Sequence, residues 1–353
     1  MTVLNQVREQ LQQKKLDAIL ITNPYNRRYL TGFTGTSGTC LITETAALFV
    51  TDFRYTKQAS EQVRDFEIIE HKTSMEEELN TQLKKHEIKR LGFEADDISF
   101  AKYKQYRDSF TTELVDTKGL IEALRLVKTE SEIDIIQDAA SIADQAFDHI
   151  LTFIEPGVTE IEVANELEFY MRKLGATSSS FDIIVASGYR SALPHGVASS
   201  KVIESGELVT MDFGALYEGY CSDITRTIAV GEINEDLKKI YNTVLEAQKR
   251  GVQHTKAGLT GKEADALTRD YITEQGYGKY FGHSTGHGLG MEVHESPSLS
   301  PRSTTPLAAG MVVTVEPGIY IEDIGGCRIE DDIVITKSGN RILTQAPKEL
   351  ITV

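Results

Sequence analysis

This sequence is poor in long apolar runs and in cysteine. It contains no stretch of about 18 consecutive apolar residues, so we expect no membrane span. The opening MTVLNQVREQLQQKKLDAIL predicts a polar amphipathic helix and a short strand, without the apolar core of a signal peptide, so export is not expected either. Cys40, Cys221 and Cys327 are odd in number and widely spaced, which excludes a disulfide framework. A reducing compartment, the cytoplasm, fits best.

Basic residues are also scarce. Acidic residues outnumber them 53 to 37, for a net charge of -16, and no dense stripe of Lys and Arg is present. Nucleic acid is therefore not an expected partner, because binding it requires cations along the phosphate backbone. The glycine-rich segment TGFTGTSGT at 31–39 lacks the lysine and the spacing of a phosphate-binding P-loop, so we interpret it as a turn.

The length of 353 residues suits two domains at roughly 150 residues each. In residues 1–125, short β-rich runs (DAILIT, AALFVT, FEIIEH, RLGFEA) alternate with helical patterns, which predicts an α/β domain. A long amphipathic helix follows, beginning with a capping box of Thr129 and Glu132. We therefore place a boundary near Leu126 and a second domain at 126–353.

The second domain contains an internal repeat. A capped helix with a glycine stop occurs twice at a displacement of 101 residues: Gly157, Thr159, Glu162, Tyr170 and Gly175 recur as Gly258, Thr260, Glu263, Tyr271 and Gly276. The segment SGELVTMDFG at 205–214 matches AGMVVTVEPG at 309–318 at a displacement of 104. Two matches in the same order predict two related halves around a pseudo-two-fold axis, each with helices and a β-hairpin.

The repeat brings acidic residues to equivalent positions. Asp212 and Glu316 each follow an apolar β-run that should bury them, and a buried unpaired carboxylate is costly, so a positive partner is implied. Asp223 and Glu330 follow 11 and 14 residues later. Turns near 218–219 and 325–326 would return the chain as hairpins and bring all four acids to the pseudo-axis.

Two divalent cations would balance four carboxylates, and oxygen ligands with one imidazole suit Mn, Co, Fe or Zn. The segment FGHSTGHGLGMEVHESP offers His283, His287 and His294 among glycines that allow close backbone approach. Taken singly, each acid or histidine has an ordinary structural explanation, but these do not account for the recurrence in both halves. Paired metals activate water for hydrolysis, of an amide or of a phosphate ester.

These residues resemble the pita-bread metallopeptidases, the family of aminopeptidase P, prolidase, methionine aminopeptidase and creatinase. The motifs MDFG, HGLG, VEPGIY and RIEDD carry the resemblance, which covers nearly the whole chain. NRRYLTGFTG and ALFVTDFRY are similar to the creatinase-type N-terminal domain. The resemblance implies an α+β protein, in which a pita-bread catalytic domain with an internal pseudo-two-fold repeat follows an α/β creatinase-like domain.

The resemblance also implies residue roles. It makes Asp223 and Glu330 bridging ligands of two metal ions, Asp212 a ligand of one, and His287 and Glu316 ligands of the other. Glu316 would handle the proton of the nucleophilic water, a hydroxide bridging the metals. The implied catalytic and substrate-binding residues are His294 at the oxyanion, His195 near the substrate proline, His283 as a further active-site histidine, Tyr320 as a hydrogen-bond donor and Arg328 beside the metal carboxylates.

His195, Arg328 and the large N-terminal domain favour the Xaa-Pro branch of the family. The expected substrates are dipeptides and short peptides with proline second, and the expected cofactors are two Mn ions per subunit, with Co, Zn or Fe as alternatives. The resemblance further implies a homodimer. A strict prolidase remains an alternative, since Arg302, in HESPSLSPR, could bind a dipeptide carboxylate. Less favoured alternatives are another aminopeptidase and a non-catalytic binding protein of the same fold.

Overall fold

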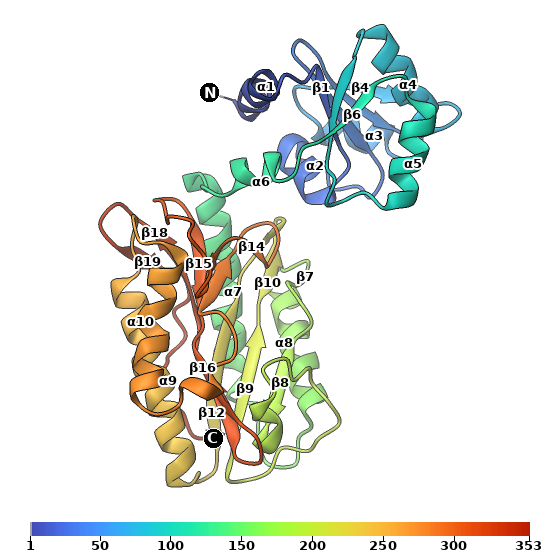
Figure 1. Ribbon diagram of the computed structural model, residues 1–353. Helices are drawn as coiled ribbons and strands as arrows, with labels where there is room; N and C mark the ends of the chain where they lie inside the picture. The colour runs from blue at the N-terminus through green and yellow to red at the C-terminus, as the bar shows by residue number, and fades with distance from the viewer. Residues whose placement is uncertain (1) are drawn as a thin grey trace. The chain divides into compact units, whose positions relative to one another are not determined.

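The computed structural model describes residues 2–353, which form two compact units divided between Arg125 and Leu126 (Figure 1). No helix within the described residues is long and apolar enough to cross a membrane.

The first unit is built on a six-stranded mixed sheet of order β4-β3-β2-β1-β5-β6. Its strands are β1 Ala18–Ile21, β2 Thr39–Thr43, β3 Ala47–Thr51, β4 Glu67–Glu70, β5 Arg90–Phe93 and β6 Glu113–Asp116. Its helices are α1 Val3–Lys14, α2 Pro24–Thr31, α3 Thr56–Gln62, α4 Met75–Lys85, α5 Phe100–Ser109 and α6 Leu120–Arg125. Along β1, Ile19 and Ile21 pack into one core cluster while Ala18 and Leu20 pack into another, so both faces of the sheet are covered.

The four predicted strand runs are confirmed as β1, β3, β4 and β5. Two further strands, β2 and β6, were not predicted. The glycine-rich segment at 31–39 is a loop, as predicted, but its last residue already begins β2. It starts at the C-terminal end of α2, where Gly32 (φ 74°) takes the left-handed conformation that ends many helices.

The second unit has two pairs of helices and four small sheets. The helices are α7 Glu130–Ile150, α8 Glu160–Lys173, α9 Glu235–His254 and α10 Gly261–Glu274, with 3₁₀ turns η1 Gly188–Ala192 and η2 Gly278–Tyr280. The sheets have the orders β11-β10-β7, β12-β9-β8, β14-β13-β15-β18-β19 and β16-β17. In Figure 1 the strands run between α8 on one side and α9 with α10 on the other.

The strands of this unit are short and mostly antiparallel. They are β7 Ser178–Ser179, β8 Ile184–Ser187, β9 Glu207–Phe213, β10 Ala215–Tyr217, β11 Tyr220–Cys221, β12 Ile224–Val230, β13 Gly286–Gly288, β14 Glu295–Leu299, β15 Val312–Val315, β16 Gly318–Ile321, β17 Gly325–Arg328, β18 Asp331–Ile335 and β19 Asn340–Ile342.

The two halves of the unit repeat the same local structure. The predicted capping box of α7 is confirmed, and α8 and α10 each begin with the complete capping box that the repeat predicts, Thr159 with Glu162 and Thr260 with Glu263. The preceding loops are anchored alike, because the Gly157 amide donates to the Ile203 carbonyl and the Gly258 amide to the Leu307 carbonyl. The antiparallel strand pair β9/β12 of the first half corresponds to the pair β15/β18 of the second half.

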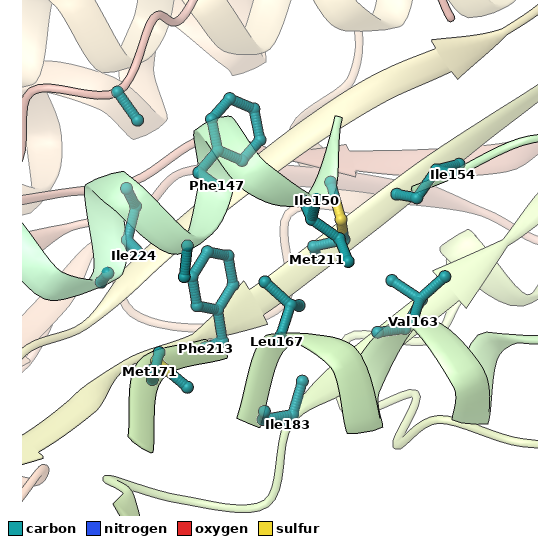
Figure 2. Close-up of a cluster of buried hydrophobic side chains, with 14 of the residues drawn as sticks. Phe147, Ile150, Ile154, Val163, Leu167, Met171, Ile183, Met211, Phe213 and Ile224 are labelled. Carbon is teal, nitrogen blue, oxygen red and sulfur yellow. The ribbon is translucent and has the colours of Figure 1, made fainter. Parts of the chain in front are cut away.

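A large apolar core lies between α7, α8 and β9 (Figure 2). Phe147 and Ile150 from α7 meet Val163, Leu167 and Met171 from α8, all fully buried. On β9, Met211 and Phe213 point into this core. Because side chains alternate along a strand, Asp212 between them points to the opposite face. The core therefore fixes the strand that presents the first acid of the predicted site.

Candidate metal centre

A cleft of about 520 Å³ lies in the second unit. Nine of the predicted site residues line it: His195, Asp212, Asp223, His283, His287, His294, Glu316, Arg328 and Glu330. The tenth, Tyr320, is hydrogen-bonded to two of these side chains. Arg302, considered as a carboxylate-binding residue, is exposed and is not among the lining residues. Residues spread over more than a hundred positions thus meet in one place.

The two acids of the first half are placed by adjacent strands. Asp212 near the end of β9 is paired in register with Thr225 of β12, and Asp223 immediately precedes that strand. The hairpin β10–β11 lies between them and turns at Glu218 and Gly219, both with positive φ. The predicted turn is therefore present, and the returning chain places Asp223 on the cleft beside Asp212.

The second half repeats this arrangement. Glu316 follows β15 and Glu330 precedes β18, and the register of Val315 with Asp331 sets the two acids at the same end of the strand pair. The intervening hairpin β16–β17 turns at 322–324, not at 325–326 as the sequence suggested. The two glycines instead begin the return strand, opposite Ile321 and Tyr320.

His287 reaches the acids from β13. Its Nε2 lies 3.3 Å from Glu316 Oε1 and 3.6 Å from Asp223 Oδ2. Possible ligand atoms of Asp223, His287 and Glu330 all lie within 4.8 Å of one another. The neighbouring Gly286 is required here, because a Cβ at that position would come within 2.0 Å of the Thr314 carbonyl oxygen.

The carboxylates are strongly perturbed. Burial, and after it the charge of Glu330, raises the pKa of Asp223 well above its usual range, while burial and the charge of Glu316 do the same for Glu330. Burial, with a further contribution from Asp212, raises the pKa of Glu316 to about 8. Such a cluster cannot hold all its negative charges without cations.

Buried oxygen atoms without hydrogen-bond partners also indicate that the cluster requires cations. Asp212 Oδ1, Asp223 Oδ1 and Glu330 Oε1 are buried and have no hydrogen-bond partner among the described residues. Buried polar atoms are nearly always paired, so each unpaired oxygen requires an explanation. Hard oxygen donors together with one imidazole form a ligand set that fits divalent ions of the Mn, Co, Fe and Zn group.

A hydrogen-bonded chain supports one side of the cluster. Arg328 Nη2 donates to Asp212 Oδ2 at 2.5 Å, and its Nη1 donates to the Tyr320 hydroxyl at 2.7 Å. The Tyr320 hydroxyl lies 2.8 Å from His283 Nε2. Burial, and then the nearby Arg328 cation, lower the pKa of His283 to about 4, so its ring is neutral. Tyr320 therefore donates to Nε2, and Nδ1 donates to the Ser284 carbonyl at 2.8 Å.

The two other histidines are on the open side of the cleft. The His294 ring is 4.3 Å from the His287 ring, and burial, followed by His287, lowers the pKa of His294. His195 lies in the exposed segment after η1, and its ring makes no hydrogen bond within the described part of the chain. Both side chains line the cleft, and neither is hydrogen-bonded to an acid of the cluster in the described part of the chain.

Sequence reasoning missed three supporting residues. Thr225 Oγ1 donates to Glu330 Oε2 at 2.6 Å and accepts from Arg328 Nε at 3.0 Å. Asp332 accepts a 2.9 Å hydrogen bond from the Asp223 amide. The fully buried Arg226 donates to the Glu330 carbonyl and to Asp331. These residues lie in the segments ITRTI and RIEDD beside the ligands, and that adjacency was the available signal.

Known proteins share both units of this structure. Residues 134–337 match the model of metallopeptidase family M24, and residues 4–127 match that of the creatinase/prolidase N-terminal domain. The structure of a Xaa-Pro dipeptidase from Bacillus anthracis is 61% identical, with a TM-score of 0.98 and 99% of each chain covered. The X-Pro aminopeptidase from Thermotoga maritima MSB8 is 42% identical, with a TM-score of 0.92 over 98% of this chain and 100% of that one.

A Xaa-Pro dipeptidase of Pyrococcus horikoshii is 44% identical over 97% of each chain. These full-length similarities confirm the predicted α+β architecture, with a creatinase-type domain before a pita-bread domain, and the predicted metallopeptidase class. The chain belongs to metallopeptidase family M24, a family of enzymes that depend on divalent metal ions.

Proposed function

We propose that this protein hydrolyses Xaa-Pro bonds at the N-terminus of dipeptides and short peptides. The observation that carries the proposal is the cluster of five acid and imidazole side chains, with unpartnered buried oxygens, in a chain similar over its full length to Xaa-Pro peptidases. The proposed setting is the cytoplasm, and the proposed assembly is a homodimer. With its net charge of -16, the protein is proposed to have neither nucleic acid nor membrane as a partner.

The metal ligands would be Asp212, Asp223, His287, Glu316 and Glu330. Two divalent ions, Mn first and Co, Zn or Fe as alternatives, would balance the four carboxylates, because a single divalent ion would leave the cluster negatively charged even with the Arg328 cation beside Asp212. Asp223 and Glu330 would bridge them, Asp212 would complete one site, and His287 with Glu316 the other. When bound, such ions supply Lewis acidity and lower the pKa of a water molecule.

The remaining chemistry would belong to side chains of the cleft. Glu316, which accepts a 3.1 Å hydrogen bond from Thr314 Oγ1, would take the proton of the attacking water and pass it towards the leaving nitrogen. His294 would donate to the carbonyl oxygen as negative charge develops there. His195, whose ring has no partner among the described residues, would contact the substrate around the proline.

Arg328, Tyr320 and His283 would hold the ligands in place. The neutral His283 fixes the direction of the Tyr320 hydroxyl, and the Arg328 guanidinium partly offsets the negative charge of Asp212. Substitution of any of these three residues should therefore disturb the orientation of the ligand side chains and weaken metal binding.

The cleft supports activity on peptides longer than two residues. A strict dipeptidase requires a cation for the substrate's C-terminal carboxylate, yet Arg328 is the one Lys or Arg among the described lining residues, and it is bound to Asp212 and Tyr320. Arg302, exposed outside the lining, offers no such contact. Both dipeptides and short oligopeptides are therefore the proposed substrates.

Hydrolysis of three peptides tests the proposal. The protein, reconstituted with Mn or Co, should cleave Ala-Pro and Ala-Pro-Ala, and an EDTA-treated sample should cleave neither. Cleavage of Ala-Pro alone would indicate a strict prolidase. Preference for Met-Ala-Ala would contradict the Xaa-Pro assignment, and no metal-dependent cleavage of any peptide would contradict enzymatic function at this site.

A further inference from the structure

The segment that carries His195 is held by a buried carboxylate outside the ligand cluster. Glu160, the first residue of α8, is fully buried. Its Oε1 accepts hydrogen bonds from the Ser187 amide (2.8 Å) and hydroxyl (2.9 Å). Its Oε2 accepts from the Ser199 amide (3.1 Å), from the Ser199 hydroxyl (2.7 Å) and from Arg190. Ser187 and Ser199 are the residues on either side of the loop 188–198, which contains His195.

Further contacts fix the same loop inside these two ends. Arg190, bound to Glu160, also donates to the Val197 carbonyl across the loop at 2.9 Å. Arg328 donates to the Pro194 carbonyl at 3.1 Å, and the Gly326 amide donates to Ser191 Oγ at 2.8 Å. The residue next to His195 is thus attached to the arginine that binds Asp212, so the loop is connected both to α8 and to the ligand cluster.

Most of the loop surface lacks the apolar packing that would otherwise hold it. Tyr189, Leu193 and Val197 are 64%, 49% and 51% exposed. A short exposed segment with few buried contacts opens easily unless polar contacts restrain it. A buried carboxylate with five donors, one of them a cation, is a strong restraint, because charge-assisted hydrogen bonds are about twice as strong as neutral ones.

The internal repeat indicates that this carboxylate serves a purpose specific to one half. The equivalent of Glu160 is Gly261, and both amides make the same bond, to the Lys201 and Thr305 carbonyls respectively. The helix start therefore needs no glutamate. At Gly261 a Cβ would lie 2.1 Å from the Ser298 carbonyl oxygen, so the second half has no space for one. The carboxylate occurs only in the half that carries the His195 loop.

We propose that Glu160 is a positioning residue for substrate binding, which fastens both ends of the loop 188–198 and so holds His195 over the cleft. The inference rests on the proposed role of His195 in contacting the substrate proline. Glu160 itself touches no ligand of the acid cluster, so its loss should affect substrate affinity and not metal content.

Glu160→Gln tests this with minimal change of shape. The amide keeps one acceptor oxygen but presents an NH₂ group to donors, so amide hydrogen exchange across 187–199 should accelerate by about tenfold or more. With the Mn-loaded enzyme, kcat/KM for Ala-Pro should fall about tenfold, mainly through KM, at unchanged metal content. The matched control is Glu166→Gln on the same helix, whose carboxylate pairs with His149 at 2.6 Å and should leave the loop unaffected.

A double-mutant cycle separates positioning from general destabilisation. In a His195→Ala background, Glu160→Gln should lower kcat/KM less than about twofold, because both changes act through the same side chain. Unchanged exchange in Glu160→Gln, or a full additional loss in the double variant, would overturn the proposal. If Glu160→Gln does not fold, Ser199→Ala, which removes one bond to Glu160, should show the same effects at smaller size.

Hydrogen exchange measures the loop whether or not the protein cleaves proline peptides. An inactive wild-type protein would therefore contradict the proposed function while the exchange result still decides whether Glu160 holds the loop.

Discussion

Asp223 and Glu330 are the residues whose charge the site can least spare, because each has a buried oxygen without a partner among the described residues and, unlike Asp212, neither forms an ion pair with Arg328. Asp223→Asn or Glu330→Gln should abolish metal binding and lower Ala-Pro hydrolysis by about 100-fold or more. Metal content measured by mass spectrometry is the direct test. Asp182→Asn, in the same cleft but outside the ligand set, should retain its metal. Normal metal content in either cluster variant would contradict the proposed ligand set.

Substitution of His195 should leave the bound metal in place, unlike substitution of Asp223 or Glu330. Its ring is exposed to the cleft and contacts no acid of the cluster, so His195→Ala should keep its metal while kcat/KM for Ala-Pro falls about tenfold through the lost substrate contact. Steady-state kinetics together with metal analysis would show this. Loss of metal in this variant would mean that His195 supports the ligands, against the role proposed for it.

His195, Tyr320 and Arg328 were named only through the family resemblance. The four acids and the other three histidines could be identified from the sequence, because the acids recur at equivalent positions of a repeat and His283, His287 and His294 cluster in a short segment. Thr225, Asp332 and Glu160 could not, because their importance lies in which atoms they touch. Glu160 accepts from residues 27 and 39 positions away, a relation that no spacing rule predicts. Its place in a helix start makes it look like an ordinary favourable charge at a helix N-terminus.

The strand β13 is tightly constrained at Gly286. Gly286 approaches β15 so closely that an added Cβ would be 2.0 Å from the Thr314 carbonyl oxygen. Gly286→Ala should push β13 and His287 away from the acids, costing about 1–3 kcal/mol of stability and weakening metal binding. Thermal unfolding and metal titration measure the two effects. Gly282→Ala is the control, because a Cβ there meets nothing within 4 Å. Equal stability and equal metal affinity of the two variants would show that the close approach of Gly286 to β15 does not hold His287 in place.

Helices with clear caps and strands with β-rich runs were predictable, because local propensity and tertiary structure agree there. The capping boxes at Thr129, Thr159 and Thr260 are examples. The strand β2 was missed because it starts within a run of small polar residues and is stabilised by pairing with both β1 and β3. The second hairpin turn was misplaced because the glycines at 325–326 were taken as the turn, whereas the chain turns at 322–324, with Asp323 at positive φ, and Gly325 already begins β17.

At the scale of the whole molecule, the acid cluster couples folding to metal and to pH. Burial raises the pKa of Glu316 from its ordinary 4.5 to about 8, and those of Asp223 and Glu330 are raised as well. Without metal, the native state keeps protons that the unfolded chain loses above about pH 4.5, so stability falls as the pH rises to about 8. Bound cations should remove this penalty.

The melting temperature of EDTA-treated protein should therefore drop more steeply between about pH 5 and pH 8 than that of the Mn-loaded protein. Scanning calorimetry of both forms at matched ionic strength would measure the difference. If the melting temperature of the metal-free protein instead rose between about pH 5 and pH 8 relative to that of the Mn-loaded protein, the acids would not be buried together as in the structure.

Metal-free protein titrated with Mn²⁺, with bound metal and Ala-Pro hydrolysis followed on the same samples, tests the central claim most directly. We expect two ions to bind per chain, hydrolysis to be absent before metal is added, and hydrolysis to reach its maximum as the two sites fill. Full hydrolysis of Ala-Pro without metal, or saturation with metal and no hydrolysis, would contradict this claim.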